Sequence, residues 1–493
     1  YDNKRNERKR KMIMKHEDEH KSDRMKVITG FFWKFGERII VLGVSFLIMV
    51  ILSRLLSPSE YGMVAMALVV INIADVFVTA GLGNSLIQKK DADSKDFSTA
   101  FYLNVIISVI IYICVFFIAP LIEKFFHYRD LSAVIRVLCL RIPIAAVNSV
   151  QCAYISRNMQ FKLFFGATLW GTLISGGAGV ALALSGFGVW ALVVQYLLNA
   201  VIDTCILWVR AGWRPTKEFD IATGKGLFRY GWKLMVSGLL DMTYSQIRNL
   251  IIGKKYSAAD LAYYTNGSQY PQAATSAIST SISSVLFPVL SKKQETVDSV
   301  KQITRRAVSI SSYLLWPVML GIIVVAPSFI TVFLTDKWLP CVPFIRIACI
   351  AYGFWPVHTA NLEALKATGH SDIFLKLEII KCSIAIAILC LAMRYGIIAI
   401  AFSAVVTSIV SCFINAYPNV KILKYTYLEQ ISDIMPSMIK SAAMAVIIWG
   451  IGTQLENNLV RLCVQIVAGI VVYFAISLMT KDANFNYLKK LVR

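Results

Sequence analysis

Charged residues are scarce in this sequence, and from Ile39 onward only short polar segments separate its apolar runs. Asp, Glu, Lys and Arg make up 16% of the 493 residues, hydrophobic residues make up 57%, and the mean hydropathy is +0.62. A soluble chain of this length does not carry so apolar a composition. The shortage of charge therefore excludes a soluble globular protein and indicates a polytopic membrane protein.

The sequence also lacks the motifs of the common enzyme classes. It contains no Walker A sequence, no HExxH and no Cys/His spacing typical of a metal site. Asp91 and Asp93 in "DAD" resemble the paired carboxylates of glycosyltransferases, but they lie in a short predicted loop beside Lys89, Lys90 and Lys95. We therefore expect no enzyme activity, no metal and no cofactor.

Two further absences concern the cysteines and the beginning of the chain. Of the ten cysteines, only Cys341 falls in a predicted outer loop, so we expect no disulfide framework. Residues 1–24 are charged and lack the apolar core of a signal peptide, which makes Met25 the candidate native start. Residues 1–30 are expected to form a charged cytoplasmic tail, with a basic arm that contacts anionic lipid as the alternative.

Long apolar stretches, by contrast, are abundant. About 20 helical residues cross a bilayer, and a backbone without access to water must satisfy its hydrogen bonds within a helix. The stretches predict an all-α membrane fold with about fourteen spans. Their expected cores are 39–56, 63–87, 101–122, 131–155, 164–184, 189–209, 227–252, 261–290, 308–334, 344–365, 374–393, 397–417, 434–451 and 459–479.

The net charge of +21 follows the predicted topology. With the N-terminus inside, roughly 33 of the 50 Lys and Arg residues fall on the inner side and about 6 fall outside. This asymmetry predicts that both termini are cytoplasmic. It also makes basicity a topology signal, so we expect no nucleic-acid partner.

An internal repeat organises the chain. "LSRLLSPSEYG" (52–62) is matched without a gap by "IGKKYSAADLA" (252–262). The aligned pairs are Ser57 with Ser257, Glu60 with Asp260, and Gly62 with Ala262. Other matches follow in the same order, such as "IAP" (118–120) with "VAP" (325–327).

Each repeat holds about six spans, so both have the same orientation and should form two lobes around an axis along the membrane normal, with a substrate cavity between them. The expected segments are an N-lobe (31–210), a cytoplasmic connector (211–226), a C-lobe (227–420), a further helix pair (434–480) and a cytoplasmic tail (481–493). In the fifth span, Gly171, Ser175, Gly179 and Ala183 form a small-residue ridge that favours close helix packing.

Polar residues form stripes on three predicted spans. A charge inside a span is costly unless it faces a partner or a hydrated cavity. The stripes comprise Lys34, Arg38 and Ser45 with Glu37 beside them, then Asn72, Asp75, Thr79 and Gly83, and finally Lys233, Ser237, Asp241, Tyr244 and Arg248. We interpret them as walls of a hydrated cavity whose excess of cations suits an anionic head group. Ion pairing within each stripe is the alternative interpretation.

Other charged residues within spans are weaker candidates. His358, Asn361, Glu363 and Lys366 cluster on the tenth predicted span, where they form either a proton-coupling site or an ordinary hydrogen-bonded group. The remaining intramembrane cations are expected to pair or to snorkel. They are Arg54, Arg136, Arg141, Arg346, Lys381, Lys440 and Arg461.

The beginning of the chain resembles a known family. "LSRLLSPSEYG" (52–62) and "GLGNSLIQKKD" (81–91) are similar to the opening of Wzx-type polysaccharide flippases, and weaker similarity extends over the chain from Met25. These flippases form the polysaccharide-transporter branch of the superfamily that also contains multidrug exporters and lipid II flippases. One departure is Thr79, where the family pattern predicts an acid. Asp75 lies one turn earlier, and the sequence leaves open whether it takes the place of that acid.

The resemblance implies a flippase in the bacterial cytoplasmic membrane. It would move undecaprenyl-diphosphate-linked oligosaccharide to the outer leaflet by alternating access, for capsule, exopolysaccharide, O-antigen or teichuronic-type polymer assembly. Its expected partners are the lipid-linked substrate, membrane lipids, and a polysaccharide polymerase with chain-length machinery.

The stripes then supply the candidate residues for this activity. Those for the head group and cavity are Lys34, Arg38, Lys233, Arg248, Asn72, Asp75 and Asp241, and those for coupling or pairing are Glu37, His358 and Glu363.

Three alternatives have different requirements. A cation-coupled multidrug exporter of the same fold takes mostly cationic substrates, which a basic cavity disfavours, and it needs a buried unpaired carboxylate. A polymerase or ligase of lipid-linked sugars usually needs a large outer loop, and the predicted outer loops are short. A lipid II flippase resembles the chain less around "LSPSEYG" (56–62).

Overall fold

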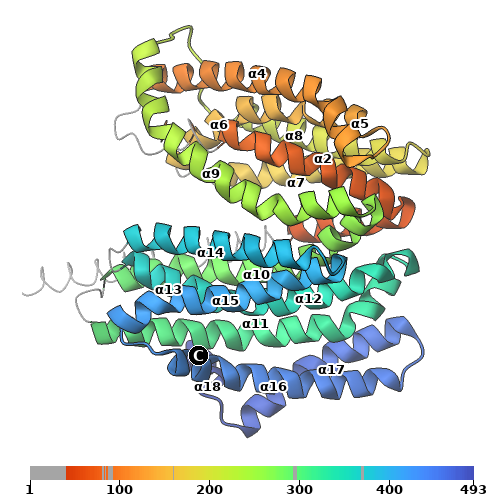
Figure 1. Ribbon diagram of the computed structural model, residues 1–493, viewed down its shortest axis with the longest axis vertical. Helices are drawn as coiled ribbons and strands as arrows, with labels where there is room; N and C mark the ends of the chain where they lie inside the picture. The colour runs from red at the N-terminus through yellow and green to blue at the C-terminus, as the bar shows by residue number, and fades with distance from the viewer. Residues whose placement is uncertain are drawn as a thin grey trace, which may run out of the picture. The chain divides into compact units, whose positions relative to one another are not determined.

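The computed structural model is helical throughout the part of the chain that it describes, which confirms the predicted all-α class. It describes residues 40–79, 83, 85–86, 93–158, 160, 162–292, 297–367 and 371–492. Figure 1 shows the elements with the labels used below.

The helices follow one another with short connections. An apolar helix, Ile40–Leu55, comes before the labelled elements. These are α2 (Pro58–Thr79), α4 (Ser94–Phe126), α5 (Leu131–Leu138), α6 (Arg141–Arg157), α7 (Lys162–Leu184), α8 (Val189–Arg210), α9 (Ile221–Lys255), α10 (Ala258–Lys292), α11 (Val297–Phe333), the 3-10 helix η1 (Asp336–Cys341), α12 (Val342–Gly353), α13 (Trp355–Ala367), α14 (Ser371–Ala392), α15 (Ile397–Ile422), α16 (Tyr427–Thr453), α17 (Asn458–Met479) and α18 (Ala483–Val492).

Each predicted span core overlaps helical residues, and two cores are divided between consecutive helices, α5 with α6 and α12 with α13. By length and composition, ten helical segments within the described residues can cross a membrane. The helices α9, α10 and α14 are also long, but they contain more polar or charged residues. The number fourteen therefore remains a prediction.

The repeated sequence forms the same local structure twice. The hydroxyl of Ser57 accepts a hydrogen bond from the backbone N–H of Glu60 (3.4 Å), and the Glu60 carboxylate accepts one from the backbone N–H of Ser57 (2.6 Å). Ser257 and Asp260 exchange the equivalent bonds at 3.1 and 3.2 Å. Both are capping boxes, which satisfy the free N–H groups at the start of a helix. The repeat therefore encodes the N-termini of α2 and α10.

A similar exchange of hydrogen bonds gives the second aspartate of the "DAD" sequence (91–93) a structural role. The Asp93 carboxylate accepts the backbone N–H of Asp96 (2.8 Å), and the Asp96 carboxylate accepts the N–H of Asp93 (3.1 Å). Asp93 is thus the N-cap of α4. Asp91 lies outside the described residues.

The described chain divides into two compact units by its internal contacts. Unit 1 takes its described residues from 40–55, 70–123 and 129–242, and unit 2 takes them from 56–69, 124–128 and 243–492. The helices α2, α4 and α9 contribute residues to both units. The lobes and connector expected from the sequence remain predictions.

Within unit 1, α7 and α8 form a close pair, and α5 and α6 also pack on α8. Two residues of the predicted ridge carry the α7–α8 contact: Gly171 lies against Asp203 and Asn199, and Gly179 lies against Gln195. The prediction of close packing along this ridge is confirmed at these two glycines.

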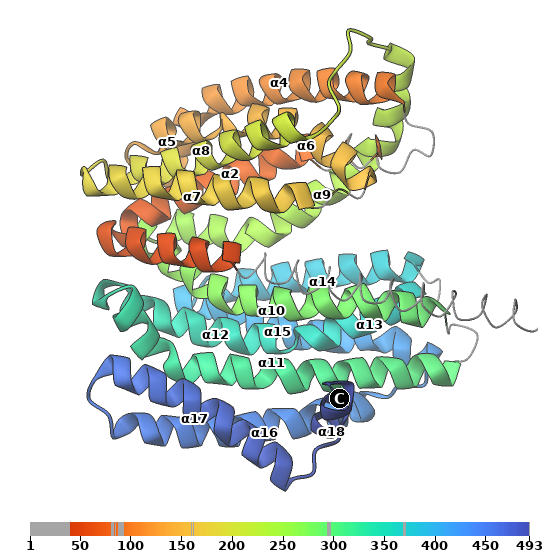
Figure 2. The ribbon, with the colours of Figure 1, turned by 180° about the vertical axis from the view of Figure 1, so that it is seen from behind.

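Within unit 2, α11 is the central helix and packs against α10, α12, α13, α16 and α17. Figures 1 and 2 show α16 and α17 on the side of α11 away from α14. Arg305 of α11 donates two hydrogen bonds of 2.9 Å to the Asp433 carboxylate of α16. Lys301 of α11 forms an ion pair with Glu429 of α16 at 2.9 Å. Within unit 2, α16 is therefore held to α11 by charge as well as by packing.

Candidate functional site

Part of the predicted basic stripe lies outside the described residues. Lys34, Glu37 and Arg38 belong to this part. Lys233 lies in α9, but its side chain is likewise outside the described part. Their roles remain predictions from the sequence.

Arg248 is the best-defined member of the predicted head-group site. It lies on α9 and is half-buried against α15, with its Nε 3.4 Å from the Ser403 hydroxyl and its Nη2 3.4 Å from the Thr407 hydroxyl. Both hydroxyls are buried and also donate to carbonyl groups within α15. The guanidinium is therefore held in place by neutral groups.

Aromatic and carboxylate neighbours complete this environment. The hydroxyls of Tyr244, Tyr264 and Tyr352 lie close enough to interact with the Arg248 charge. Among the described residues of unit 2, no Asp or Glu forms an ion pair with Arg248, and nearby Glu378 pairs with Lys381 at 2.5 Å. A weakly hydrated cation without a counter-ion can take an anionic oxygen from a ligand.

A second polar cluster occupies unit 1. Oδ2 of Asp75 on α2 lies 3.8 Å from the Arg141 guanidinium at the start of α6, and the Asp75 side chain is only 13% exposed. The other carboxylate oxygen is buried without a hydrogen bond among the described residues. Asn72, one turn earlier, is half-buried, and Thr79 uses its hydroxyl to bind the Asp75 carbonyl (2.8 Å). Asp75 is therefore partly paired and keeps one unsatisfied oxygen.

Asp203 is a site residue that the sequence analysis missed. It lies on α8, and its buried Oδ1 has no hydrogen-bond partner among the described residues. A Cβ on Gly171 would lie only 2.2 Å from this oxygen, so the glycine provides the space for the carboxylate. A carboxylate within the apolar stretch 189–209 was the available signal, but it stood apart from the stripes.

The tenth-span cluster is hydrogen-bonded and paired. Nε2 of His358 lies 3.2 Å from the Ser408 hydroxyl, and Nδ1 lies 3.1 Å from the Asn415 amide. Glu363 pairs with Lys366 at 3.3 Å. These contacts match the ordinary hydrogen-bonded interpretation of the cluster, and a coupling role remains a prediction.

Asp241 and the remaining intramembrane cations lie outside these clusters. Asp241 lies on the exposed face of α9. Five of the cations that were expected to pair or to snorkel have partners. Three donate to backbone carbonyls: Arg136 to that of Phe116, Arg346 to that of Ile323, and Arg461 to that of Leu455. Two form ion pairs: Lys381 with Glu378, and Lys440 with Asp482. Their partners set them apart from Arg248, for which the described residues of unit 2 provide hydroxyl groups and no counter-ion.

Comparison with known proteins places this arrangement in a family. Residues 51–343 match the family described as polysaccharide biosynthesis protein. The chain belongs to this polysaccharide biosynthesis family. The matched region covers more than half of the chain and includes both capping-box repeats.

Relatives of this polysaccharide biosynthesis protein align over most of their length. The lipopolysaccharide biosynthesis protein WzxC of Escherichia coli is 22% identical, with 87% of this chain and 89% of the relative covered. The succinoglycan biosynthesis transport protein ExoT of Rhizobium meliloti is also 22% identical, over 94% of each chain. The teichuronic acid biosynthesis protein TuaB of Bacillus subtilis is 21% identical, with 81% of this chain and 84% of the relative covered.

Solved structures show the same fold. The lipid II flippase MurJ in an inward closed conformation superposes with a TM-score of 0.74 at 16% identity, over 93% of this chain and 98% of its own. An inward-facing multidrug transporter of the MATE family superposes with a TM-score of 0.60 at 14% identity, over 79% of this chain and 99% of its own. The comparisons confirm the predicted membrane transporter fold and the resemblance to Wzx-type flippases, and they support a transport protein rather than an enzyme.

Proposed function

We propose that this polysaccharide biosynthesis protein moves an undecaprenyl-diphosphate-linked oligosaccharide from the inner to the outer leaflet of the bacterial cytoplasmic membrane. The names of its relatives, which concern lipopolysaccharide, succinoglycan and teichuronic acid, support a polysaccharide substrate. The fold that it shares with a lipid II flippase supports a lipid-linked one. The exported glycan would then serve capsule, exopolysaccharide, O-antigen or teichuronic-type polymer assembly.

The observation that carries this proposal at the residue level is Arg248. Its guanidinium has no carboxylate partner in the described part of unit 2 and is surrounded by hydroxyl groups. A diphosphate offers the bidentate anionic oxygens that guanidinium binds best, and sugar hydroxyls hydrogen-bond well to Ser, Thr and Tyr. Lys34, Arg38 and Lys233 are proposed as further head-group contacts on the evidence of the sequence pattern alone.

The proposed mechanism is alternating access. The charged head group would be exposed to one side of the membrane at a time, while the prenyl chain stays in lipid. A charged group is costly to place in hydrocarbon, whereas the apolar prenyl chain is not. Asn72, Asp75 and Asp241 are proposed to contact sugar hydroxyls or to tune the basic residues. Both termini are proposed to be cytoplasmic, and a polymerase with chain-length machinery would consume the product.

A cation-coupled exporter is the second candidate, and one observation favours it. Asp203 presents a buried carboxylate oxygen without a hydrogen-bond partner in the described part, and such a group can bind a proton or a metal cation reversibly. Parallel measurement of ethidium efflux separates this candidate from lipid transfer. Loss of efflux in Asp203→Asn, with lipid transfer absent in the unmodified protein, would establish the exporter.

Removal of the Arg248 charge tests the flippase proposal in cells that lack their own copy of the gene. We expect Arg248→Gln to lower polymer export at least tenfold, because one charge-assisted contact to a phosphate contributes about 1.5–3 kcal/mol. Arg38→Ala and Lys233→Ala, singly and together, are expected to lower export as well. Export is measured as surface polysaccharide per cell at equal protein levels.

Arg461→Gln is the matched control, because it removes a guanidinium that is bound to the Leu455 carbonyl in the loop before α17. Export by this variant should stay within about twofold of normal. Normal export by Arg248→Gln would remove Arg248 from the head-group site.

A further inference from the structure

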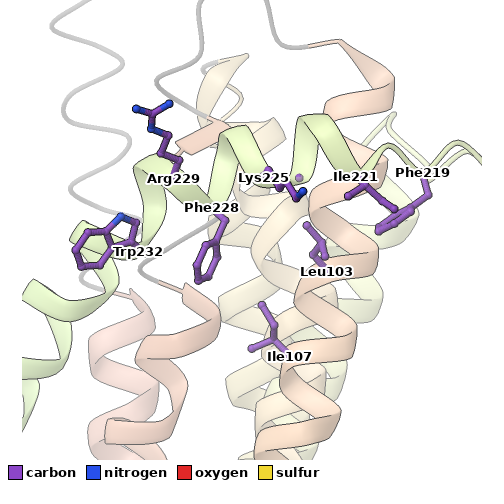
Figure 3. Close-up of a pocket in the computed structure, with 9 residues that line it drawn as sticks. Leu103, Ile107, Phe219, Ile221, Lys225, Phe228, Arg229 and Trp232 are labelled. Atoms are coloured by element: carbon purple, nitrogen blue, oxygen red, sulfur yellow. The ribbon is translucent and has the colours of Figure 1, made fainter.

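A separate pocket lies in unit 1, between α4 and the first turns of α9. Its volume is about 520 Å³, and its lining surface is almost entirely apolar. Leu103 and Ile107 of α4 face Phe228 of α9, and Trp232 lies one turn further along (Figure 3). Two cations, Lys225 and Arg229, also line the pocket.

The beginning of α9 is fixed against α4 by a local network. The Asp220 carboxylate accepts the backbone N–H of Ala222 (3.1 Å) and the hydroxyl of Thr223 (2.7 Å), and these bonds hold its pKa below the usual range. The backbone N–H of Asp220 in turn donates to the Thr99 hydroxyl of α4 (3.2 Å). The pocket wall is therefore anchored at its N-terminal end.

A glycine sets the distance between the two helices. A Cβ on Gly224 would lie 2.9 Å from Cδ1 of Leu103, so the glycine allows this close approach without a shift of the Leu103 side chain. Phe228 and Trp232 come one and two turns later, where they keep 49% and 44% of their surface exposed. The two helices are thus in tight contact at Gly224, and further along α9 the pocket lies between α4 and the exposed side chains of Phe228 and Trp232.

The two cations form one edge of this pocket. Lys225 and Arg229 are spaced i, i+4 and so share one face of α9. Both are exposed, and neither forms an ion pair within the described part of unit 1. The nearby Asp220 carboxylate accepts a hydrogen bond from the Thr223 hydroxyl and forms an ion pair with Lys95 at 3.6 Å. In Figure 3 Arg229 points away from the apolar side chains.

We propose that this pocket binds an anionic glycerophospholipid, with one acyl chain against Leu103, Ile107 and Phe228 and the phosphate at Lys225 and Arg229. A soluble anion would leave the apolar walls unfilled, and a cationic amphiphile would be repelled at the edge. Trp232 is a residue type enriched at membrane interfaces, and basic residues beside a membrane attract anionic lipid. The inference is independent of the flippase proposal, because it assigns no transport step to this lipid.

The test is titration of the purified full chain in detergent with phosphatidylglycerol or phosphatidylcholine, followed by native mass spectrometry. We expect phosphatidylglycerol to bind about thirtyfold more tightly, since two basic residues near a membrane contribute roughly 1 kcal/mol each. Lys225→Gln together with Arg229→Gln should abolish this preference and leave phosphatidylcholine binding unchanged. Lys217 is an exposed cation that precedes α9 and does not line the pocket, so Lys217→Gln is the control and should bind as the unmodified chain does.

A second variant tests the apolar part. Ile107→Trp fills the pocket and should weaken both lipids, whereas the charge variants affect only the anionic one. Equal affinity for the two lipids, or an unchanged preference in the charge variants, would overturn the proposal. Stronger binding of undecaprenyl phosphate than of phosphatidylglycerol would also overturn it, because the pocket would then belong to the prenyl carrier. The charge variants lie at an exposed edge, so their result stands even where Ile107→Trp fails to fold.

Discussion

At the scale of single residues, the two polar clusters differ in how their charges are balanced. Arg248 is surrounded by neutral hydroxyls, whereas Asp75 lies 3.8 Å from Arg141 and Asp203 has a buried oxygen without a partner in the described part. Unit 2 therefore offers a cation to a ligand, and unit 1 offers carboxylate oxygens.

The fit between Gly171 and Asp203 gives a prediction at this scale. Gly171→Ala places a Cβ 2.2 Å from Oδ1 of Asp203, so we expect a loss of about 1–3 kcal/mol in stability, measured as a lower Tm in detergent. Gly177→Ala, on the same helix with no atom within 4 Å of the added Cβ, should leave Tm unchanged.

A double variant checks the cause. Asp203→Ala removes the oxygen that the new methyl would meet, so Gly171→Ala should cost much less in that background. An equal cost in both backgrounds would mean that Asp203 does not contact Gly171.

At the scale of elements, the starts of α2 and α10, each with its own capping box, lie together within unit 2. A Cβ on Gly62 would lie 1.7 Å from the Ala258 carbonyl oxygen, and Tyr61 packs edge-on to Trp338 with ring centroids 5.2 Å apart. Lys337 also donates to the Leu56 carbonyl at 2.8 Å. The two segments that the sequence repeat aligns, 52–62 and 252–262, are therefore in contact at Gly62 and Ala258.

Gly62→Ala tests this contact between helix starts. The obstacle is a backbone carbonyl that no side-chain rotation removes, so we expect Tm to fall and polymer export to drop several-fold at equal expression. Gly43→Ala is the control, because nothing lies within 4 Å of its added Cβ. Unchanged Tm and export in Gly62→Ala would show that α2 and α10 do not approach each other in this way.

At the scale of the whole molecule, the sequence predicts the helices well and the polar contacts only in part. Long apolar stretches dictate helices in a membrane, so each expected span overlaps helical residues. The repeat was visible because the two capping boxes need similar side chains at the same spacing. Asp203 was missed because its neighbour is a glycine on another helix, and a single-helix stripe cannot show a contact between helices.

The central claim is that the chain transfers a lipid-linked oligosaccharide between leaflets. The most direct test is transfer of a fluorescent prenyl-diphosphate oligosaccharide in proteoliposomes, read with a membrane-impermeant quencher, with ethidium efflux measured alongside. We predict transfer that exceeds protein-free liposomes, without ethidium efflux. Efflux without transfer would contradict the account and identify a drug exporter of the same fold.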